Sequence, residues 1–262
     1  MTDWGSLEEE LRRWADAGRL ATLWWRDDDA ERPTTALERL LEVAGDAGAR
    51  LALAVIPARA ERALAEMLGG QDVAVLQHGY AHRNHAPPEA KKEELGPHRP
   101  FANTLGELAM GWQGIEALFR PLALPVLVPP WNRIAPHLVP MLPEIGYRGL
   151  STHGPRARAH PVAGFNQANT HIDVIDWAGT RDFIGAPAAL GLAVAHLRDR
   201  RLGTVDPGEP TGLLTHHLAQ SGESFRFLSD FAQVIANDPG ARWVGAAEAF
   251  GLAPVGTLAA AS

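Results

Sequence analysis

The sequence alternates short apolar runs with longer amphipathic stretches, and this alternation limits the folds that the chain can adopt. The apolar runs have the length and composition of β-strands, and they cover residues 21–25, 51–56, 73–77, 125–128, 147–151, 171–175, 212–215 and 242–244. Helical patterns lie between them, at residues 35–47, 58–68, 105–119, 186–198 and 225–235. Repeated strand–helix–strand units predict an α/β fold with a parallel sheet, as a barrel or a doubly wound sheet. With 262 residues, no linker and no internal repeat, we expect one domain over residues 1–262, with its core at about 20–250.

Composition excludes several classes of protein. The net charge of −7 argues against a nucleic-acid partner, which would require a basic face. The N-terminus lacks the basic and apolar regions of a signal peptide, and no apolar run approaches the ~18 residues of a membrane span, so we expect a cytoplasmic protein without a membrane partner. The chain has no cysteine, so a bound metal would need His, Asp, Glu, backbone oxygen or water as ligands.

Three adjacent carboxylates follow the first apolar run. Asp27, Asp28 and Asp29 come directly after Arg26, where we expect the strand to give way to a loop. Adjacent carboxylates repel one another and cost stability unless a cation or hydrogen bonds neutralise them. The structural alternative is a solvated loop in which Asp29 caps the next helix.

A pair of histidines follows the run at 73–77. His78 and His82 are four residues apart, a spacing that places two imidazoles on one side of a helical turn or tight loop. His85 follows, although a solvated loop position is the favoured interpretation for this residue alone. A carboxylate and two histidines that leave coordination positions open can hold a catalytic divalent metal, so the sequence predicts a metal-dependent hydrolase.

Polar or aromatic residues end three further strand-like runs: Trp131 and Asn132 after 125–128, Asp176 and Trp177 after 171–175, and His216 and His217 after 212–215. In parallel α/β folds, the carboxyl ends of the strands form the face where active sites are built. Neighbouring side chains of a strand point to opposite faces, so only one of the two adjacent histidines can enter a site, and we favour His216. The structural alternatives are a proline-stiffened turn packed by Trp131 and a histidine that fills the barrel mouth.

Two polar segments interrupt the alternation. Residues 83–100 contain three prolines, and residues 152–168 are rich in His, Gly, Pro and Arg. Both are longer than typical connections between strands and helices. Loops of this length often serve as functional lids.

The order and spacing of these residues resemble the polysaccharide deacetylase superfamily, the NodB-like proteins of carbohydrate esterase family 4. The resemblance covers roughly residues 20–217 and implies a single distorted (β/α)7 barrel, similar to a TIM barrel. In the first family motif, one Asp is the general base and the next binds the metal, which implies Asp28 as base and Asp29 as ligand. A shift by one residue, to Asp27 and Asp28, is the alternative. The second motif implies His78 and His82 as the other ligands.

The remaining motifs match less completely. The third is Arg-x-Pro-aromatic; Pro130 and Trp131 match it, but Val128 stands where the family has the arginine that orients and tunes the base. The fourth is approximated by Asp176-Trp177. The fifth, Leu-x-His, is matched by Leu214-Thr215-His216 and implies His216 as the acid that protonates the leaving amine. The resemblance also implies substrate-binding roles for Trp131, Asn132 and Trp177.

The resemblance implies a hydrolase that removes an acyl group, N-acetyl above all, from a sugar or a related small N-acylated substrate. Mixed Asp and His ligands suit zinc, with cobalt, nickel or manganese as alternatives. The missing arginine motivates a second hypothesis, a catalytically impaired barrel that binds metal and a glycan-like ligand. A third is a metal-dependent hydrolase of another small amide. Such barrels can use a His-x-His pair or a carboxylated lysine, but this chain has no His-x-His, and Lys91 and Lys92 are its only lysines. The sequence leaves the oligomeric state open.

Overall fold

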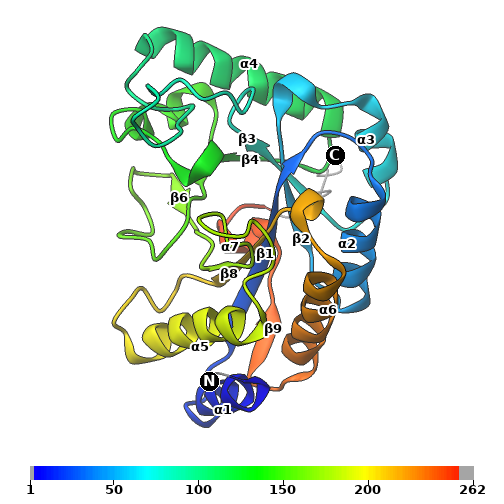
Figure 1. Cartoon of the computed structure of the whole chain (residues 1–262). Coiled ribbons are helices and arrows are strands. Elements are labelled where there is room, and N and C mark those ends of the chain that lie inside the picture. The colour runs from blue at the N-terminus through cyan, green and yellow to red at the C-terminus, as the bar shows by residue number, and fades with distance from the viewer. Residues whose placement is uncertain (1–2, 254–262) are drawn as a thin grey trace, which may run out of the picture.

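The computed structural model describes residues 3–253, in which one parallel sheet is surrounded by helices (Figure 1). The strands are β1 (Ala21–Ala30), β2 (Leu51–Val55), β3 (Ala74–His78), β4 (Ala123–Val128), β5 (Gly149–Leu150), β6 (Asn166–Gln167), β7 (Ile172–Asp173), β8 (Thr211–Thr215) and β9 (Ala241–Trp243). They are hydrogen-bonded in the order β6-β5-β4-β3-β2-β1-β8-β7, with β9 paired to β1 off this path. The sheet curls into an incomplete barrel with β6 and β7 at its two ends. The predicted α/β fold, a distorted (β/α) barrel, is confirmed.

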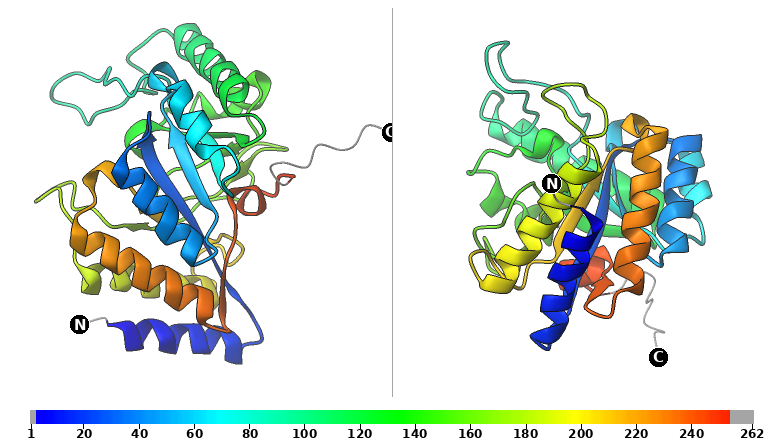
Figure 2. Two further views of the ribbon diagram at one scale, coloured as in Figure 1. Left: turned by 90° about the vertical axis from the view of Figure 1, so that its right-hand side faces the viewer. Right: turned by 60° about the horizontal axis from the view of Figure 1, so that its bottom comes forward.

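The helices cover the outer face of the sheet. They are α1 (Trp4–Asp16), α2 (Thr35–Asp46), α3 (Arg62–Leu68), α4 (Phe101–Phe119), α5 (Ala186–Leu202), α6 (Gly222–Asn237) and α7 (Ala246–Ala249). Short 3₁₀ turns are η1 (Pro57–Arg59), η2 (Pro130–Asn132), η3 (Val139–Met141), η4 (Pro143–Ile145) and η5 (His217–Ala219). Helices α2 and α6 pack side by side, as do α1 and α5 (Figure 2). Among the described residues, no helix is both long and apolar enough to cross a membrane.

Side-chain alternation along the central strand β1 divides the core into two parts. Leu23 and Trp25 face outward and belong to the large apolar cluster between the sheet and the helices. Trp24 faces inward, where it packs with small residues of β2 and β3 such as Ala52 and Ala74. Small inward side chains let the curled sheet close around a large indole, because the interior must be filled without voids.

The boundaries of several elements differ from the predictions. Strand β1 extends to Ala30, so Arg26 and the three aspartates lie within the strand and not in a loop after it. The extension is supported by parallel pairing with β8 as far as Asp27 and with β2 as far as Ala30. The interpretation of Asp29 as a helix cap is wrong, because Thr34 is the N-cap of α2 and its side chain accepts a hydrogen bond from the backbone N–H of Leu37.

Three other elements were missed or have different bounds from those predicted. The sequence prediction contained no helix at α1, although Leu7, Leu11 and Trp14 bury one of its faces. The segment 152–168, predicted as a loop, contributes the short strand β6 to the edge of the sheet beside β5. The predicted strand at 147–151 shortens to the two residues of β5. Such short strands carry too few residues for a periodicity signal.

Candidate active site

A cavity of about 270 Å³ lies at the carboxyl ends of the strands. It is lined by Asp28, Asp29, His78, His82, Trp131, Asn132, Arg133, Asp173, Trp177 and His216. Every residue that the sequence analysis assigned to catalysis, metal binding or substrate binding is in this set. Residues far apart in the sequence therefore meet at the face of the barrel where α/β enzymes build their sites.

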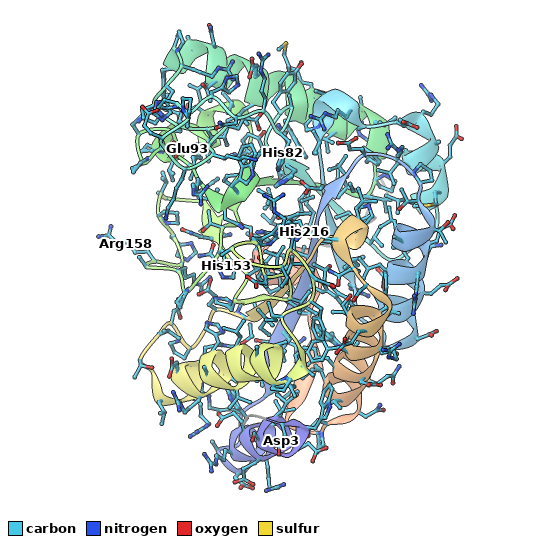
Figure 3. All side chains as sticks on the ribbon, in the orientation of Figure 1. Asp3, His82, Glu93, His153, Arg158 and His216 are labelled. Carbon is cyan, nitrogen blue, oxygen red and sulfur yellow. The ribbon has the colours of Figure 1, made fainter. Side chains whose placement is uncertain are left out.

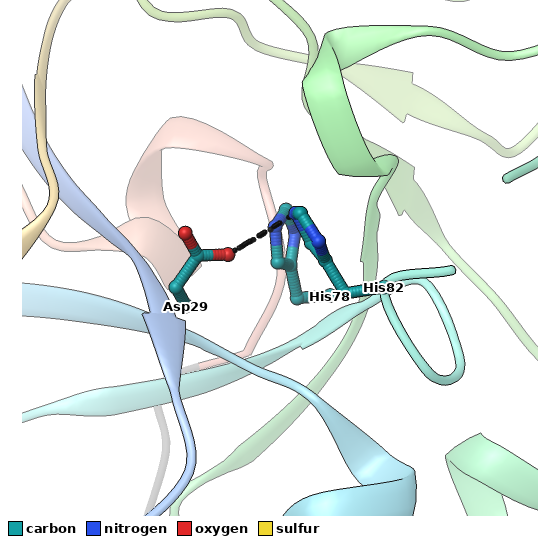
Figure 4. Close-up of side chains that lie close together, drawn as sticks. All are labelled: Asp29, His78 and His82. Carbon is teal, nitrogen blue, oxygen red and sulfur yellow. Dashed lines mark ion pairs between the residues drawn. The ribbon is translucent and has the colours of Figure 1, made fainter. Parts of the chain in front are cut away.

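Asp29, His78 and His82 form a cluster of three metal-type ligands (Figure 4). Oδ1 of Asp29 lies 3.1 Å from Nε2 of His78 and 3.3 Å from Nε2 of His82. His78 is the last residue of β3, whereas His82 lies in the loop that follows. Two elements thus bring one carboxylate oxygen and two imidazole nitrogens to a common point.

The hydrogen bonds around this cluster fit a bound cation. Nδ1 of His78 lies 3.0 Å from the backbone oxygen of Val128, to which it can only donate, so Nε2 of the neutral ring presents a lone pair to the cluster. Oδ1 of Asp29 is buried without a hydrogen-bond partner in the described part of the chain. Burial opposes ionisation of Asp29, but the proximity of His78, His82 and His216 outweighs burial and holds the pKa of this carboxyl far below its usual value. An anionic carboxylate that faces the lone pair of His78 and the imidazole of His82 fits a positive charge placed between them.

A second cluster of the same residue types does not fit a metal. His171, His196 and Glu209 are buried together, and the two imidazole rings stack with centroids 3.4 Å apart. Here the backbone N–H of Gly212 donates to Nδ1 of His171, so the neutral ring carries its proton on Nε2, the atom that faces Glu209. That nitrogen has no lone pair for a metal. Stacked rings also direct their remaining lone pairs in parallel and not toward one point.

Asp28 is held by a buried guanidinium from its own strand. Nε and Nη2 of Arg26 donate to the two carboxylate oxygens of Asp28, at 2.8 and 3.0 Å. The same guanidinium donates to Oγ of Ser151 at 2.6 Å and to Oδ1 of Asn132 at 2.7 Å. Both Arg26 and Asp28 are almost fully buried. Although Val128 occupies the motif position of the family arginine, this structure supplies a guanidinium to Asp28 from Arg26.

The backbone of β1 gives the three adjacent aspartates different environments. Asp27 faces away from the cavity; its carboxylate accepts a hydrogen bond from Oγ1 of Thr215 at 2.7 Å and lies 2.6 Å from Nδ1 of His217. Asp28 faces the cavity, as strand alternation requires. Asp29 also lines the cavity because its φ of +71° is left-handed and the register between β1 and β2 shifts after Asp27. The alternative ligand-and-base assignment to Asp27 and Asp28 therefore has no support in the geometry.

Unusual backbone conformations gather at this site. Five non-glycine residues in the described chain have positive φ, and four of them line the cavity: Asp29, His82, Trp131 and Asn132, at +71°, +54°, +55° and +56°. Each such conformation costs about 1–3 kcal/mol and persists only where the surroundings impose it. Their concentration around one cavity indicates that these side chains are oriented at a cost in the free energy of folding.

His216 and two neighbours, Asp173 and Trp177, line another part of the cavity. The indole of Trp177 makes an edge-on contact with His216, with centroids 4.7 Å apart, and its Nε1 donates to Oδ2 of Asp173 at 3.0 Å. Burial raises the pKa of Asp173 against the opposing effect of His216. Nδ1 of His216 is buried and makes no hydrogen bond within residues 3–253.

Four further residues that the sequence analysis named as less favoured candidates lie outside the cavity lining: Asp27, His85, Asp176 and His217. Asp27 and His217 pair with each other, as described above. Nε2 of His85 lies 3.0 Å from Nη1 of Arg99. Asp176 accepts backbone hydrogen bonds from Gly179 and Thr180 in a surface turn. These groups have local partners that explain their positions.

The sequence analysis missed three residues at the site: Arg133 and Asp173, which line the cavity, and Arg26, which holds Asp28. Arg26 was visible as a charged residue two positions before Asp28, and on a strand this spacing puts both side chains on one face. It was not used because the residues were expected to form a loop. Asp173 lies three positions before Asp176, but the strand prediction gave no reason to prefer it. Only the structure shows that Asp173 lines the cavity and accepts a hydrogen bond from Trp177.

Comparison with known proteins defines the class of fold. No family model and no curated protein matches the chain. Among solved structures, a candidate polysaccharide deacetylase from Mycobacterium smegmatis is similar over 91% of this chain and 93% of its own, with a TM-score of 0.68 and 17% identity. A family 4 acetyl xylan esterase from Clostridium thermocellum in complex with a cobalt ion is similar over 89% of this chain and 94% of its own, with a TM-score of 0.55 and 13% identity.

A third similar structure is a mutant of a carbohydrate esterase family 4 pseudoenzyme with restored enzymatic activity. It covers 88% of this chain and 68% of its own, with a TM-score of 0.57 and 14% identity. These comparisons confirm the resemblance at the level of the fold. The chain has the fold of the polysaccharide deacetylases and family 4 carbohydrate esterases to which these structures belong.

Proposed function

We propose that this protein is a metal-dependent deacetylase that hydrolyses the N-acetyl or O-acetyl group of a sugar or a related small N-acylated compound. The convergence of Asp29, His78 and His82 beside a separately held carboxylate, Asp28, carries the proposal. Zinc is the metal that best suits this ligand set, with cobalt, nickel or manganese as alternatives. A cavity of about 270 Å³ suits one sugar unit with its acyl group.

A divalent ion bound by Asp29, His78 and His82 would supply Lewis acidity toward the acyl carbonyl and toward water. Asp28 accepts the proton of the attacking water as general base. The guanidinium of Arg26 fixes the orientation of the Asp28 carboxylate by donating to both of its oxygens.

His216 lines the same cavity and donates a proton to the leaving amine or alcohol. Asp173 lines the same cavity as His216, and Trp177 restricts the ring of His216 by edge-on contact. The indoles of Trp131 and Trp177 provide apolar walls for a sugar ring, and Asn132 provides polar contacts. The cavity lining thus contains a group that accepts the proton of water, Asp28, and a group that donates a proton to the leaving group, His216.

Metal dependence gives the direct test of this function. Protein stripped by a chelator, with metal removal verified by elemental analysis, should lose acetate release from N-acetylglucosamine oligomers, small N-acetylated sugars and acetylated xylan. Zn²⁺ or Co²⁺ added back should restore it. Full hydrolysis by verified metal-free protein would refute the metal-dependent mechanism. The substrate that is turned over fastest would define the acyl linkage.

A binding barrel without catalysis remains the alternative function. The similarity in fold to a family 4 pseudoenzyme and the absence of an arginine at Val128 favour it. The bidentate contact between Arg26 and Asp28 opposes it, because a protein that only binds needs no fixed base. Tight metal and sugar binding with no acetate release from any of these substrates would establish this alternative.

Replacing Arg26 with methionine should destabilise the protein and remove most of its activity. The change leaves the carboxylate of Asp28 buried and unpaired, which costs about 3–5 kcal/mol in the free energy of unfolding. The double variant Arg26→Met/Asp28→Asn removes that charge, so it should regain part of the stability but none of the activity. Denaturant unfolding and acetate release measure the two effects separately. Equal stability of the single and double variants would contradict the pairing.

A further inference from the structure

Glu94 is a buried carboxylate from a polar loop, and it reaches the segment that links the two histidines. It lies in the segment 83–100, which the sequence suggested as a lid, yet its side chain is only 1% exposed. Leu95 beside it is equally buried and pairs with Ile134 through an isolated bridge. This part of the loop is therefore packed into the protein close to the cavity. Glu93, the residue before Glu94, and His82 are labelled in Figure 3 and show where this region lies.

The carboxylate of Glu94 is surrounded by backbone donors of the loop that carries His82. The N–H of Tyr80 donates to Oε2 at 3.1 Å, and the N–H groups of Ala81 and Arg83 donate to Oε1 at 2.8 and 3.3 Å. Successive backbone N–H groups that point into one concavity form an anion-binding nest. In this structure the occupant of the nest is a carboxylate of the same chain, and no other residue in 3–253 hydrogen-bonds to these three donors through its side chain.

The conformation of the loop depends on this arrangement. Gly79 and His82 both have left-handed φ, +53° and +54°, which turns the three N–H groups inward. A Cβ atom on Gly79 would clash with Oε2 of Glu94 and with Cγ of Pro130. The left-handed backbone at His82 carries a steric penalty that the hydrogen bonds to Glu94 can offset.

We propose that Glu94 is a positioning residue for the candidate metal centre: its carboxylate locks the 79–83 loop so that the imidazole of His82 meets His78 and Asp29. The inference rests on the proposed metal site and extends it to a residue that touches neither substrate nor ligand atoms. His78 needs no such support, because it ends β3 and its Nδ1 is held by the backbone oxygen of Val128. His82 lies four residues beyond the sheet, where its ring contacts Trp131 but its backbone is placed by the loop.

The test compares Glu94→Gln with Glu93→Gln, a matched control. Both changes remove one negative charge from adjacent positions of one loop, but the carboxylate of Glu93 faces His98 and not the nest. A glutamine at 94 keeps one accepting oxygen and turns an amide N–H₂ toward a backbone donor. Zn²⁺ affinity, measured by competition with a chromophoric chelator, should fall ~10–100-fold in Glu94→Gln and change less than 2-fold in the control.

Hydrogen exchange at the backbone amides of residues 80, 81 and 83 gives a measurement that needs no metal. These amides should exchange about 10-fold faster or more in Glu94→Gln than in wild type, and unchanged in Glu93→Gln. Gly79→Ala disturbs the same contact from the other side, so it should weaken Zn²⁺ binding as well if Glu94→Gln proves too unstable to purify.

Unchanged Zn²⁺ affinity in a folded Glu94→Gln or Gly79→Ala variant would overturn the positioning role, even if the amides exchange faster. Unchanged exchange in Glu94→Gln would overturn the contact itself. If wild-type protein binds no Zn²⁺, the proposed metal site fails, whereas the exchange measurement still decides whether Glu94 fixes the loop. Failure of the proposed function and failure of this inference are thus distinguishable.

Discussion

Asp28→Asn is expected to lower acetate release ~10²–10⁴-fold while metal binding stays nearly intact. Asparagine is nearly isosteric with aspartate and can still accept a hydrogen bond from Arg26, but it cannot take a proton from water. The carboxylate of Asp29, which faces the two histidines, is left unchanged. Elemental analysis for bound metal and steady-state kinetics on the best substrate would separate the two effects.

Asp176→Asn is the matched control for this experiment. It makes the same chemical change on a carboxylate that accepts hydrogen bonds in a surface turn outside the cavity. Its activity should stay close to that of wild type. Full activity in Asp28→Asn would show that Asp28 is not the general base, and loss of metal in that variant would show that it is a ligand.

His82→Ala is expected to abolish metal binding and activity together. The change removes one of three ligand atoms, and the remaining pair, Asp29 and His78, lies 3.1 Å apart without the third donor. A metal at 100 times its dissociation constant stabilises a folded protein by about 2.7 kcal/mol, so added Zn²⁺ should raise the unfolding temperature of wild type. The same addition should leave His82→Ala unchanged.

His85→Ala controls for the loss of an imidazole from the same loop. Nε2 of His85 contacts Arg99 and not the ligand cluster. We expect this variant to bind Zn²⁺ and to gain stability from it as wild type does. A stabilisation by Zn²⁺ that survives in His82→Ala, or that disappears in His85→Ala, would contradict the assignment of the ligands.

Much of the fold could be predicted because strands and helices have local signatures. The apolar runs that became β1 to β4 and β8 were recognisable, and the parallel order follows from their alternation with helices. The two-residue strands β5 and β7 were predicted as longer runs, and β6 was missed, because pairing with a neighbour defines where such short strands begin and end. Helix α1 was missed although Asp3 caps it and its apolar side chains repeat with helical spacing.

The residues of the candidate site were predicted from residue type, spacing and position at strand ends. A pair of histidines four apart and a run of aspartates are uncommon enough to identify metal-type ligands in one sequence. Spacing could not decide which aspartate does what, because Asp27, Asp28 and Asp29 differ only in their surroundings. Nor could it distinguish the His171 cluster, whose residue types are the same.

The sequence by itself determined the alternation of strands and helices, the set of ligand-type residues and the absence of thiolate chemistry. The tertiary structure decided how these groups are used. It turned Asp27 outward to His217, supplied Arg26 to Asp28, and brought Glu94 beneath the loop of His82. The physical reason is that side-chain direction on a strand depends on where the strand ends and where its register shifts. Hydrogen-bond partners distant in sequence are fixed only when the sheet has closed around them.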